Sequence, residues 1–527
     1  MRTSPRIPAL VLIALVVIVL SIAQQDHAKE IAAPVTSGGG ELRTELAPVA
    51  APAGAMTSTF YCAGASATSG DPLDGAVVIA NASGIEVGAQ VTVYPAALAT
   101  DQQGTQAVAA LKPATKNIVV GARARAELRL ADVQPSPFAA ALVEVAGGDV
   151  AVERRTTGPL GLSVSPCAAL PSSTWYLPSG VTTKDGRELL ALFNPFVDIA
   201  VLDISFITSD GLRSPPDLQG YVVEGSRLSV IDVGAAAGRH EQVSTIVRTR
   251  SGRLVVDRLQ TFDGTDPNHA AGAAATLAAP RPAPVWAFAE GLVGDGLNEV
   301  FTVLNPGQDA AEVQLEVALD NPDVNGVVDP IIVTVPPRAY AQVAMKDQTR
   351  VPADVGHSVT VRSTNQVPVI AERVLSAVAP ARRLGYGPSL GSPVVATRWV
   401  FADGRADATL AEWLVLMNPS ADRRVRVKVT ALAQGQPLAI DGLQNLELGA
   451  GGRLAVELGQ HVNRADLTLL VEADGAVVAE RGLYAASGPG LSLSRGVPLV
   501  DGLALPPNVV PTTTTTTEPP VLTDAST

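Results

Sequence analysis

The sequence predicts an all-β protein: four tandem immunoglobulin-like or fibronectin-like β-sandwich domains behind an N-terminal transmembrane or signal helix. Two observations support this fold class. Short strand-like apolar runs recur without a convincing amphipathic helix. Equivalent asparagines, Asn81, Asn194, Asn305 and Asn418, are separated by 113, 111 and 113 positions. Such a period exceeds the roughly 20–50 residues of a propeller blade or solenoid turn and matches one small sandwich domain.

A fixed spacing between a tryptophan and an asparagine defines the repeat. Each tryptophan precedes its asparagine by 19 positions and a glycine by five. The tryptophan and asparagine pairs are Trp175 with Asn194, Trp286 with Asn305, and Trp399 with Asn418. Since a constant spacing keeps two strands in one register, we expect these residues to be equivalent core positions. The first copy differs, because it opens with Phe60-Tyr61 and its Asn81 is not followed by proline.

The fourth copy indicates the strand content most clearly. Glu412 to Met417 is an apolar run of strand length, and Trp413 within it is expected to be a core residue. Every copy is predicted to close with a β-hairpin, because two strand-like runs flank a short turn. The four turns are Gly147-Gly148, Ser251-Gly252, Asn365-Gln366 and Asp474-Gly475.

An acid-arginine pair follows each of these turns. The pairs are Glu153-Arg154, Asp257-Arg258, Glu372-Arg373 and Glu480-Arg481. Neighbouring residues of a strand face opposite ways, so one member of each pair should face the sandwich interior and need a partner. Glu188, Glu299 and Glu412, each six positions before its asparagine, are the expected partners of the arginines. We interpret the pairs as structural; the alternative is a binding site repeated in each domain.

Cys62 and Cys167 are the only two cysteines, and both belong to the first copy. In an exported chain they predict one disulfide, which would offset a weaker core in this divergent domain. Two thiols alone neither complete a structural zinc site nor form a Cys-x-x-Cys redox pair.

The N-terminus predicts export. Arg2 and Arg6 precede the uncharged apolar run 7–23, whose length lies between that of a signal peptide and that of a membrane span. An uncleaved anchor, cleavage before Gln24 and a buried helix are the three alternatives. We expect the following organisation: 1–23 signal anchor or signal peptide, 24–56 flexible linker, 57–170, 171–278, 279–394 and 395–503 the four sandwiches, and 504–527 a disordered Thr/Pro tail.

Charge and motifs favour a non-catalytic role. The formal net charge of -13 argues against a nucleic-acid partner. Gly387 to Gly391 matches a Gly-x-Ser-x-Gly elbow, but the strand-then-helix setting is missing, so it is interpreted as an interdomain loop. The loop from Asn321 to Asp329 partly matches a calcium loop, and an acidic turn is the preferred interpretation. The five histidines are isolated in the sequence and expected on the surface or in loops. We therefore assign no catalytic residue, cofactor or metal ligand.

The repeated pattern of Trp, Gly, Asn-Pro and acid-arginine resembles a family of uncharacterised actinobacterial envelope proteins, a domain of unknown function. The resemblance covers about Thr57 to Leu503 and implies an extracytoplasmic envelope setting without an active site. The expected function is a membrane-anchored, non-catalytic scaffold or interaction module. Its expected partners are the membrane, through the N-terminal helix, and cell-wall or protein components. The alternatives are a cell-wall glycan-binding module, which predicts an exposed row of Trp or Tyr, and, less favoured, an envelope hydrolase.

Overall fold

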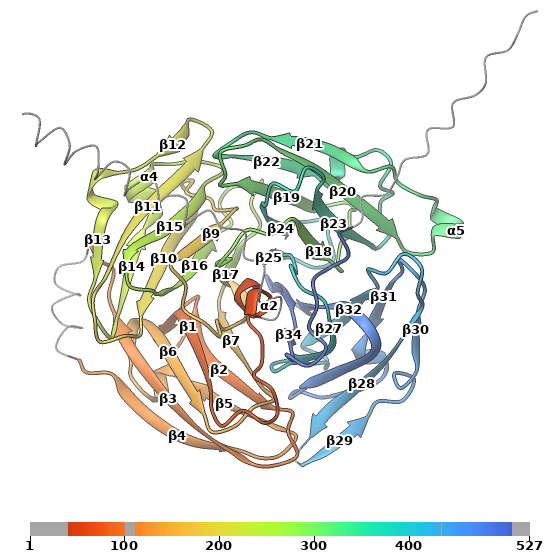
Figure 1. Ribbon diagram of the computed structural model, residues 1–527, viewed down its shortest axis with the longest axis horizontal. Helices are drawn as coiled ribbons and strands as arrows, with labels where there is room; N and C mark the ends of the chain where they lie inside the picture. The colour runs from red at the N-terminus through yellow and green to blue at the C-terminus, as the bar shows by residue number, and fades with distance from the viewer. Residues whose placement is uncertain (1–40, 101–110, 434, 509–527) are drawn as a thin grey trace, which may run out of the picture. The chain divides into compact units, whose positions relative to one another are not determined.

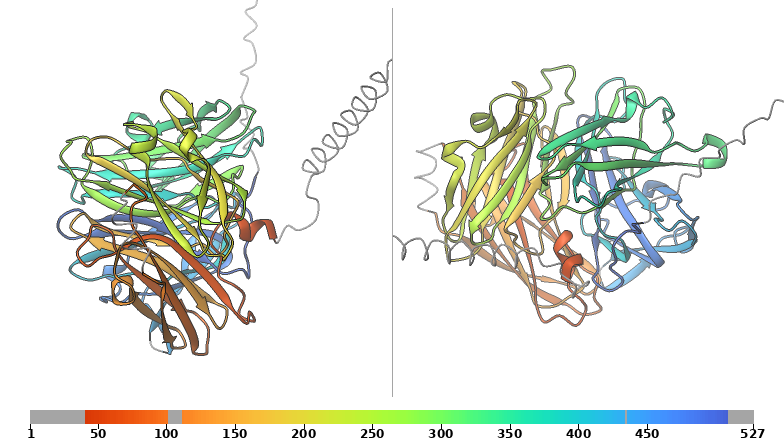
Figure 2. Two further views of the ribbon diagram at one scale, coloured as in Figure 1. Left: turned by 90° about the vertical axis from the view of Figure 1, so that its left-hand side faces the viewer. Right: turned by 45° about the horizontal axis from the view of Figure 1, so that its top comes forward.

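The computed structural model describes residues 41–100, 111–433 and 435–508, and it confirms the all-β fold class. Arg43 to Thr527 belong to one compact unit, and the description below concerns its described residues. Figure 2 shows the predominance of strands over helices. The helical segments are α2 (Glu41–Leu46), α4 (Val233–Ala237), α5 (Pro322–Asn325), η1 (Leu130–Asp132), η2 (Pro216–Leu218), η3 (Met345–Asp347) and η4 (Leu458–Gln460).

The strands pair within four consecutive groups, coloured from red to blue in Figure 1. Group 1 consists of β1 (Ser58–Ala67), β2 (Asp74–Asn81), β3 (Val87–Ala96), β4 (Ala114–Val120), β5 (Ala124–Arg129), β6 (Ser136–Val145), β7 (Val150–Gly158) and β8 (Gly161–Pro166). Group 2 consists of β9 (Thr174–Leu177), β10 (Gly186–Asn194), β11 (Ala200–Thr208), β12 (Gly211–Arg213), β13 (Gln219–Val223), β14 (Arg227–Asp232), β15 (Ser244–Ser251), β16 (Val255–Phe262) and β17 (Gly272–Leu277).

The other two groups repeat this order of strands. Group 3 consists of β18 (Val285–Phe288), β19 (Leu297–Asn305), β20 (Ala311–Leu319), β21 (Ile331–Val335), β22 (Ala339–Ala344), β23 (His357–Ser363), β24 (Ile370–Ala377) and β25 (Gly385–Leu390). Group 4 consists of β26 (Ala396–Phe401), β27 (Leu410–Met417), β28 (Val425–Ala433), β29 (Gln436–Ala439), β30 (Leu446–Leu448), β31 (Arg453–Glu457), β32 (Leu469–Ala485), β33 (Leu491–Arg495) and β34 (Val497–Pro498).

Each group distributes its strands in the same way. In group 3 one set of paired strands has the order β18-β23-β20-β21 and the other has the order β22-β19-β24-β25. Side chains from both sets meet in one core: Trp286 and Val313 of the first set belong to the same buried cluster as Phe301 and Val343 of the second. The alternating burial of β20, in which every second residue from Ala311 to Leu319 is buried, fits a strand with one face on this core.

The predicted closing hairpins are wrong. β15 pairs with β9 and β11, whereas β16, which follows the turn at Ser251-Gly252, pairs with β10 and β17. The same change of partner separates β6 from β7 and β23 from β24, while in group 4 the single strand β32 pairs in both sets. The same short turn sequences occur in β-hairpins and where the chain crosses from one sheet to another, so the local sequence does not distinguish the two cases.

The segments between groups are buried rather than flexible. After β17, Ala279 exchanges two backbone hydrogen bonds with Tyr176 of the opening strand, and Ala283 exchanges two with Val369. The Ala-rich sequence 270–284 contains the buried strand β17. These segments carry small apolar residues because they lie against strands of their own and of the next group.

The N-terminal predictions are only partly accessible. The expected linker 24–56 is not an open spacer at its end, because Leu46, Ala47, Val49 and Ala50 are buried and Ala50 donates to the carbonyl of Pro498. The predicted signal or anchor helix at 7–23 and the Thr/Pro sequence from residue 509 lie outside the described residues. Within the described part of the chain, no helix is both long enough and apolar enough to cross a membrane.

Candidate functional site: the acid-arginine cycle

The three repeated tryptophans are buried at equivalent positions. Trp175, Trp286 and Trp399 are each at most 1% exposed. Each indole Nε1 donates to a backbone carbonyl, with distances of 2.9 Å to Leu254, 2.7 Å to Val369 and 3.2 Å to Val477. A buried indole needs such an acceptor, so the tryptophans fix one packing arrangement in three groups.

The repeated asparagines hold the loop that follows the second strand of each group. In group 3, Asn305 Nδ2 donates to the carbonyls of Asp309, Val335 and Pro336 at 2.8, 3.0 and 3.1 Å. Its Oδ1 accepts from the amide of Gly307 at 2.9 Å. Asn81 and Asn194 make the corresponding bonds in their own groups, and Asn418 Nδ2 donates to the carbonyls of Arg423 and Gly449. A fully bonded buried amide explains why asparagine, rather than a smaller turn residue, occupies this position.

The glycine five positions after each tryptophan makes room for a buried side chain. A Cβ at Gly180 would lie 2.3 Å from Oε2 of Glu188, and one at Gly404 would lie 2.4 Å from Oε2 of Glu412. In group 3 a Cβ at Gly291 would lie 2.6 Å from the His357 ring. The repeated glycine therefore leaves space for the repeated glutamate in groups 2 and 4, and in group 3 for His357, which contacts Glu299.

The four arginines of the repeated pairs join neighbouring groups, and this is the main correction to the sequence prediction. The Arg154 guanidinium binds Asp257, Arg258 binds Glu372, Arg373 binds Glu480, and Arg481 binds Glu153. Each arginine thus reaches the acid of the next group, and the last one returns to the first. All eight side chains are at most 2% exposed. Group contacts therefore follow the cyclic order 1-2-3-4-1.

Each acid also accepts a backbone N–H from the group that it enters. Glu480 Oε2 accepts from the amide of Glu290 at 2.8 Å, and Glu153 Oε2 accepts from the amide of Asp403 at 2.7 Å. The equivalent donors for Asp257 and Glu372 are the amides of Gly64 and Ser179, both at 2.9 Å. These donors lie four positions after the opening aromatic residue of each group. Charge-assisted bonds of this kind compensate the loss of solvent around the carboxylates.

Burial raises the pKa of Glu153, Asp257 and Glu480, while the paired guanidinium and the backbone donor oppose this effect. Desolvation disfavours an ionised carboxyl, and a nearby cation favours it. The arrangement of these charges therefore depends on all of the partners being present at once.

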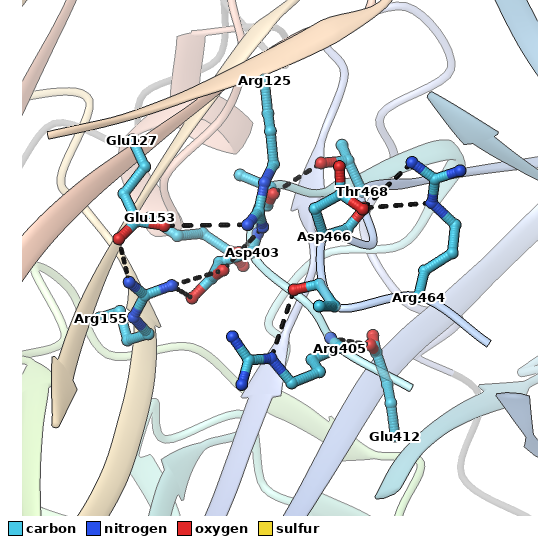
Figure 3. A network of polar contacts seen from close by, with 12 residues as sticks. Arg125, Glu127, Glu153, Arg155, Asp403, Arg405, Glu412, Arg464, Asp466 and Thr468 are labelled. Carbon is cyan, nitrogen blue, oxygen red and sulfur yellow. Dashed lines mark hydrogen bonds and ion pairs between the residues drawn. The ribbon is translucent and has the colours of Figure 1, made fainter. Parts of the chain in front are cut away.

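The junction between groups 4 and 1 carries additional charges, shown in Figure 3. The Asp403 carboxylate forms ion pairs with Arg125 at 2.8 Å and with Arg155 at 3.1 Å, and both arginines belong to group 1. Arg155 also binds Glu127. Because the Asp403 amide donates to Glu153, one residue connects the buried pair to a half-buried ion network. This network joins parts of the chain that are 278 positions apart.

The three glutamates expected to neutralise the arginines do not do so. Both carboxyl oxygens of Glu188 lack a hydrogen-bond partner in the described part of the chain. Glu299 is 2.7 Å from His357 Nε2, and Glu412 accepts from the amide of Arg405 at 2.8 Å. Burial raises the pKa of Glu188 and of Glu412 to about 8, against the opposing charges of Arg258 and Arg481. His357 is fully buried, so its predicted surface position is wrong.

Four equivalent strands, β8, β17, β25 and β33, lie where all four groups meet. β8 contacts β17, β17 contacts β25, β25 contacts β33 and β33 contacts β8. Small residues permit this approach: a Cβ at Gly272 would lie 2.6 Å from Cβ of Tyr386. Ser165 Oγ donates to the carbonyl of Ala275 at 2.9 Å, and the amide of Val164 donates to Ser492 Oγ at 2.9 Å. The strands thus add backbone and hydroxyl bonds to the cycle of charges.

The Gly-x-Ser-x-Gly sequence belongs to this inner set of strands. Ser389 lies within β25, is buried, and accepts from Arg373 Nη2 at 2.8 Å. The prediction of an interdomain loop is therefore wrong, and the serine is not at a strand-to-helix turn as a nucleophile elbow requires. Ser165 and Ser494 accept from Arg154 and Arg481 in the same way.

One cluster of side chains in the described part of the chain could hold a metal ion. Asp185, Asp266 and His269 each place a ligand atom within 4.8 Å of the others. His269 Nδ1 is 2.9 Å from Asp185 and Nε2 is 3.2 Å from Glu241, so carboxylates already engage both nitrogens. In the sequence 321–329, Pro322 to Asn325 form α5 and Asp329 binds Arg350, an arrangement that differs from converging calcium ligands.

The predicted disulfide is confirmed. Cys62 of β1 bonds Cys167, which follows β8, and joins positions 105 apart. Both residues are buried at 2% exposure. The bond ties the opening strand of group 1 to the segment that leaves this group.

Comparison with known proteins shows that part of the chain is similar to a family of unknown function. Residues 146–372 match DUF5719, and this range contains two complete acid-arginine pairs and the acid of the third. No curated protein matches the sequence.

Two solved structures show only a weak likeness. The Thermotoga maritima protein 1070 is 18% identical over 21% of this chain and 95% of its own, with a TM-score of 0.18. The Anabaena sensory rhodopsin transducer is 26% identical over 17% of this chain and 94% of its own, with a TM-score of 0.15. Scores this low carry no argument about fold or function.

Proposed function

We propose that the protein is a non-catalytic, extracytoplasmic envelope protein that acts as a scaffold or interaction module, anchored by its N-terminal helix. We further propose that each strand group is an immunoglobulin-like or fibronectin-like sandwich. The observation that carries the scaffold proposal is the closed acid-arginine cycle. Eight buried charged groups form ion pairs that join one group to the next.

The chemistry of these charges suits a structural role. A buried arginine whose donors bind a carboxylate, a serine and a backbone carbonyl, as those of Arg373 do, is held in one orientation. Groups joined in this way present their outer surfaces at fixed relative positions, which is what a scaffold requires. The disulfide is consistent with an oxidising compartment outside the cytoplasm.

The glycan-binding alternative receives less support. It predicts an exposed row of Trp or Tyr, but none of the four Trp and seven Tyr residues, all of them described, is exposed. Trp413 departs from the expected full burial and is half-buried, whereas the other three tryptophans are buried.

Two measurements test the proposal. Protease added to intact cells should cut the chain, and protection that ends only on lysis would contradict the extracytoplasmic location. The scaffold role predicts that purified chain unfolds in one cooperative transition involving all four groups. Four separate transitions, each unaffected by Glu153→Gln, would contradict a scaffold held by the cycle.

A further inference from the structure

A cavity of about 670 Å³ lies between strand groups 3 and 4. Group 3 contributes the loop between β24 and β25, with Arg383, and group 4 contributes Trp413, Arg453 and Tyr484. This volume suits a small molecule, since ligand sites commonly enclose about 300–1,000 Å³.

Arg383 has no carboxylate partner among the described residues, although acids line the same cavity. Its guanidinium carbon lies 4.0 Å from the ring centre of Tyr484 and 5.1 Å from that of Trp413. Glu290 and Asp320 are engaged by Arg453 instead, both at 2.6 Å. The aromatic rings therefore hold the guanidinium in place while leaving its N–H groups without an acceptor in the described structure.

Trp413 provides a second unused donor. Its Nε1 is buried and has no hydrogen-bond partner in the described part of the chain. The other three indoles all donate to a backbone carbonyl. A buried donor without an acceptor is costly, so its retention needs an explanation beyond packing.

The neighbouring junction shows that the fold does not require these aromatic residues. A cavity of about 610 Å³ lies between groups 2 and 3, built from equivalent strands. There, Val300 stands five positions before its asparagine, as Trp413 does, and Ser376 stands three positions after its arginine, as Tyr484 does. Structural residues recur in each group, whereas the described residues that line the cavity between groups 2 and 3 include neither this aromatic pair nor an arginine.

We propose that this cavity binds a small ligand bearing one carboxylate and additional hydroxyl or ammonium groups, either a sugar acid or an amino acid. The Arg383 guanidinium binds the carboxylate through paired N–H bonds, and the Trp413 indole donates to a further oxygen. Asp295 and Asp354, which also line the cavity, accept from the hydroxyl or ammonium groups and disfavour polyanions. This site goes beyond the scaffold function and does not depend on it.

Calorimetric titration of the purified full chain with glucuronate, alanine, glucose and acetate tests the proposal. Glucuronate or alanine should bind, and which of them binds identifies the source of the carboxylate. Glucose lacks the carboxylate and acetate lacks the other polar groups, so both should bind much more weakly.

Three variants locate the site. Arg383→Gln removes the cation, and Trp413→Leu introduces the residue that group 2 carries at this position, Leu189. Each should weaken binding about tenfold or more while leaving the thermal melting curve close to that of the wild type. Arg253→Ala is the matched control, because Arg253 also lies over an aromatic ring, that of Phe196 at 5.8 Å, away from the cavity. Binding of neither carboxylate probe, or equal binding by the wild type, Arg383→Gln and Trp413→Leu, would overturn the proposal.

Discussion

At equivalent positions, strand group 1 has a disulfide and strand group 4 has an aromatic ring packed on a glycine. In group 1, Cys62 bonds Cys167, whose amide donates to the carbonyl of Val152 at 3.0 Å. In group 4 the equivalent amide, that of Gly496, donates to Ala479 at 3.1 Å, and the Phe401 ring lies where the disulfide would be. Both carbonyls come from the residue before the acid of the acid-arginine pair.

The difference shows how one packing requirement can be met by a covalent bond or by an aromatic ring on glycine. A Cβ at Gly496 would lie 2.9 Å from Cζ of Phe401, so the ring fits only because residue 496 has no side chain. Group 3 has the same combination, Phe288 with Gly391, and in group 2 Leu177 and Ala278 belong to one buried cluster. The disulfide of group 1 thus replaces packing between the opening strand and the departing segment.

The largest expected effect comes from removing the disulfide of group 1. Cys62→Ala removes a bond that closes a loop of 105 positions. In the chain-entropy model such a loop contributes about 4–5 kcal/mol to the free energy of unfolding. Chemical denaturation followed by circular dichroism should report this loss. A reducing agent should destabilise the wild type and not the variant, and equal stability of wild type and variant would refute the role assigned to the bond.

Breaking the charged junction between these two groups should cost nearly as much. Glu153→Gln leaves Arg481 buried without its anion, and removing one partner of a buried pair costs about 3–5 kcal/mol. Hydrogen exchange should then increase in both group 4 and group 1. The control is Glu447→Gln, whose partner Arg424 is exposed, and which should cost about 0–1 kcal/mol. Similar costs for the two variants would remove the distinction between buried and exposed pairs.

A pH effect is expected in group 2, because the pKa of Glu188 is raised to about 8 by burial. In the folded chain this carboxyl keeps its proton between its ordinary pKa and about pH 8, whereas the unfolded chain loses it. The contribution of Glu188 to the free energy of unfolding is therefore fully present below about pH 4.5. It falls as the pH rises toward 8, by on the order of a few kcal/mol.

Glu188→Gln should flatten this part of the stability profile. Glu241→Gln, on an exposed side chain of the same group, is the matched control and should leave the decline near pH 8 in place. Urea denaturation at a series of pH values provides the measurement. An unchanged profile in Glu188→Gln would show that another group causes the decline.

The smallest effect is expected from reducing the space around the Phe401 ring in group 4. Gly496→Ala places a methyl group against Phe401, and such overpacking costs about 1–3 kcal/mol. Adding Phe401→Leu should recover part of the loss, because the pair then matches Leu177 and Ala278 of group 2. A double-mutant cycle measures the coupling, and additive effects would indicate that the two residues do not share one space.

Features that depend on local register could be predicted from the order of residues alone. A constant distance from tryptophan to asparagine requires the same two strands in each copy, and the structure places Trp175, Trp286 and Trp399 in equivalent buried positions. The two cysteines allowed one simple pairing, which is the one observed. Alternation along strands was also readable, because successive side chains face opposite sides.

The partner of the outward face of each strand, by contrast, became apparent only from the folded arrangement. Alternation implies that the acid and the arginine of one pair face opposite ways, but it does not say that Glu480 enters group 3 while Arg481 binds Glu153 of group 1. It likewise leaves open whether a turn joins paired strands or two sheets. These choices depend on contacts between residues more than 100 positions apart, and no local spacing in the chain encodes which surfaces will meet.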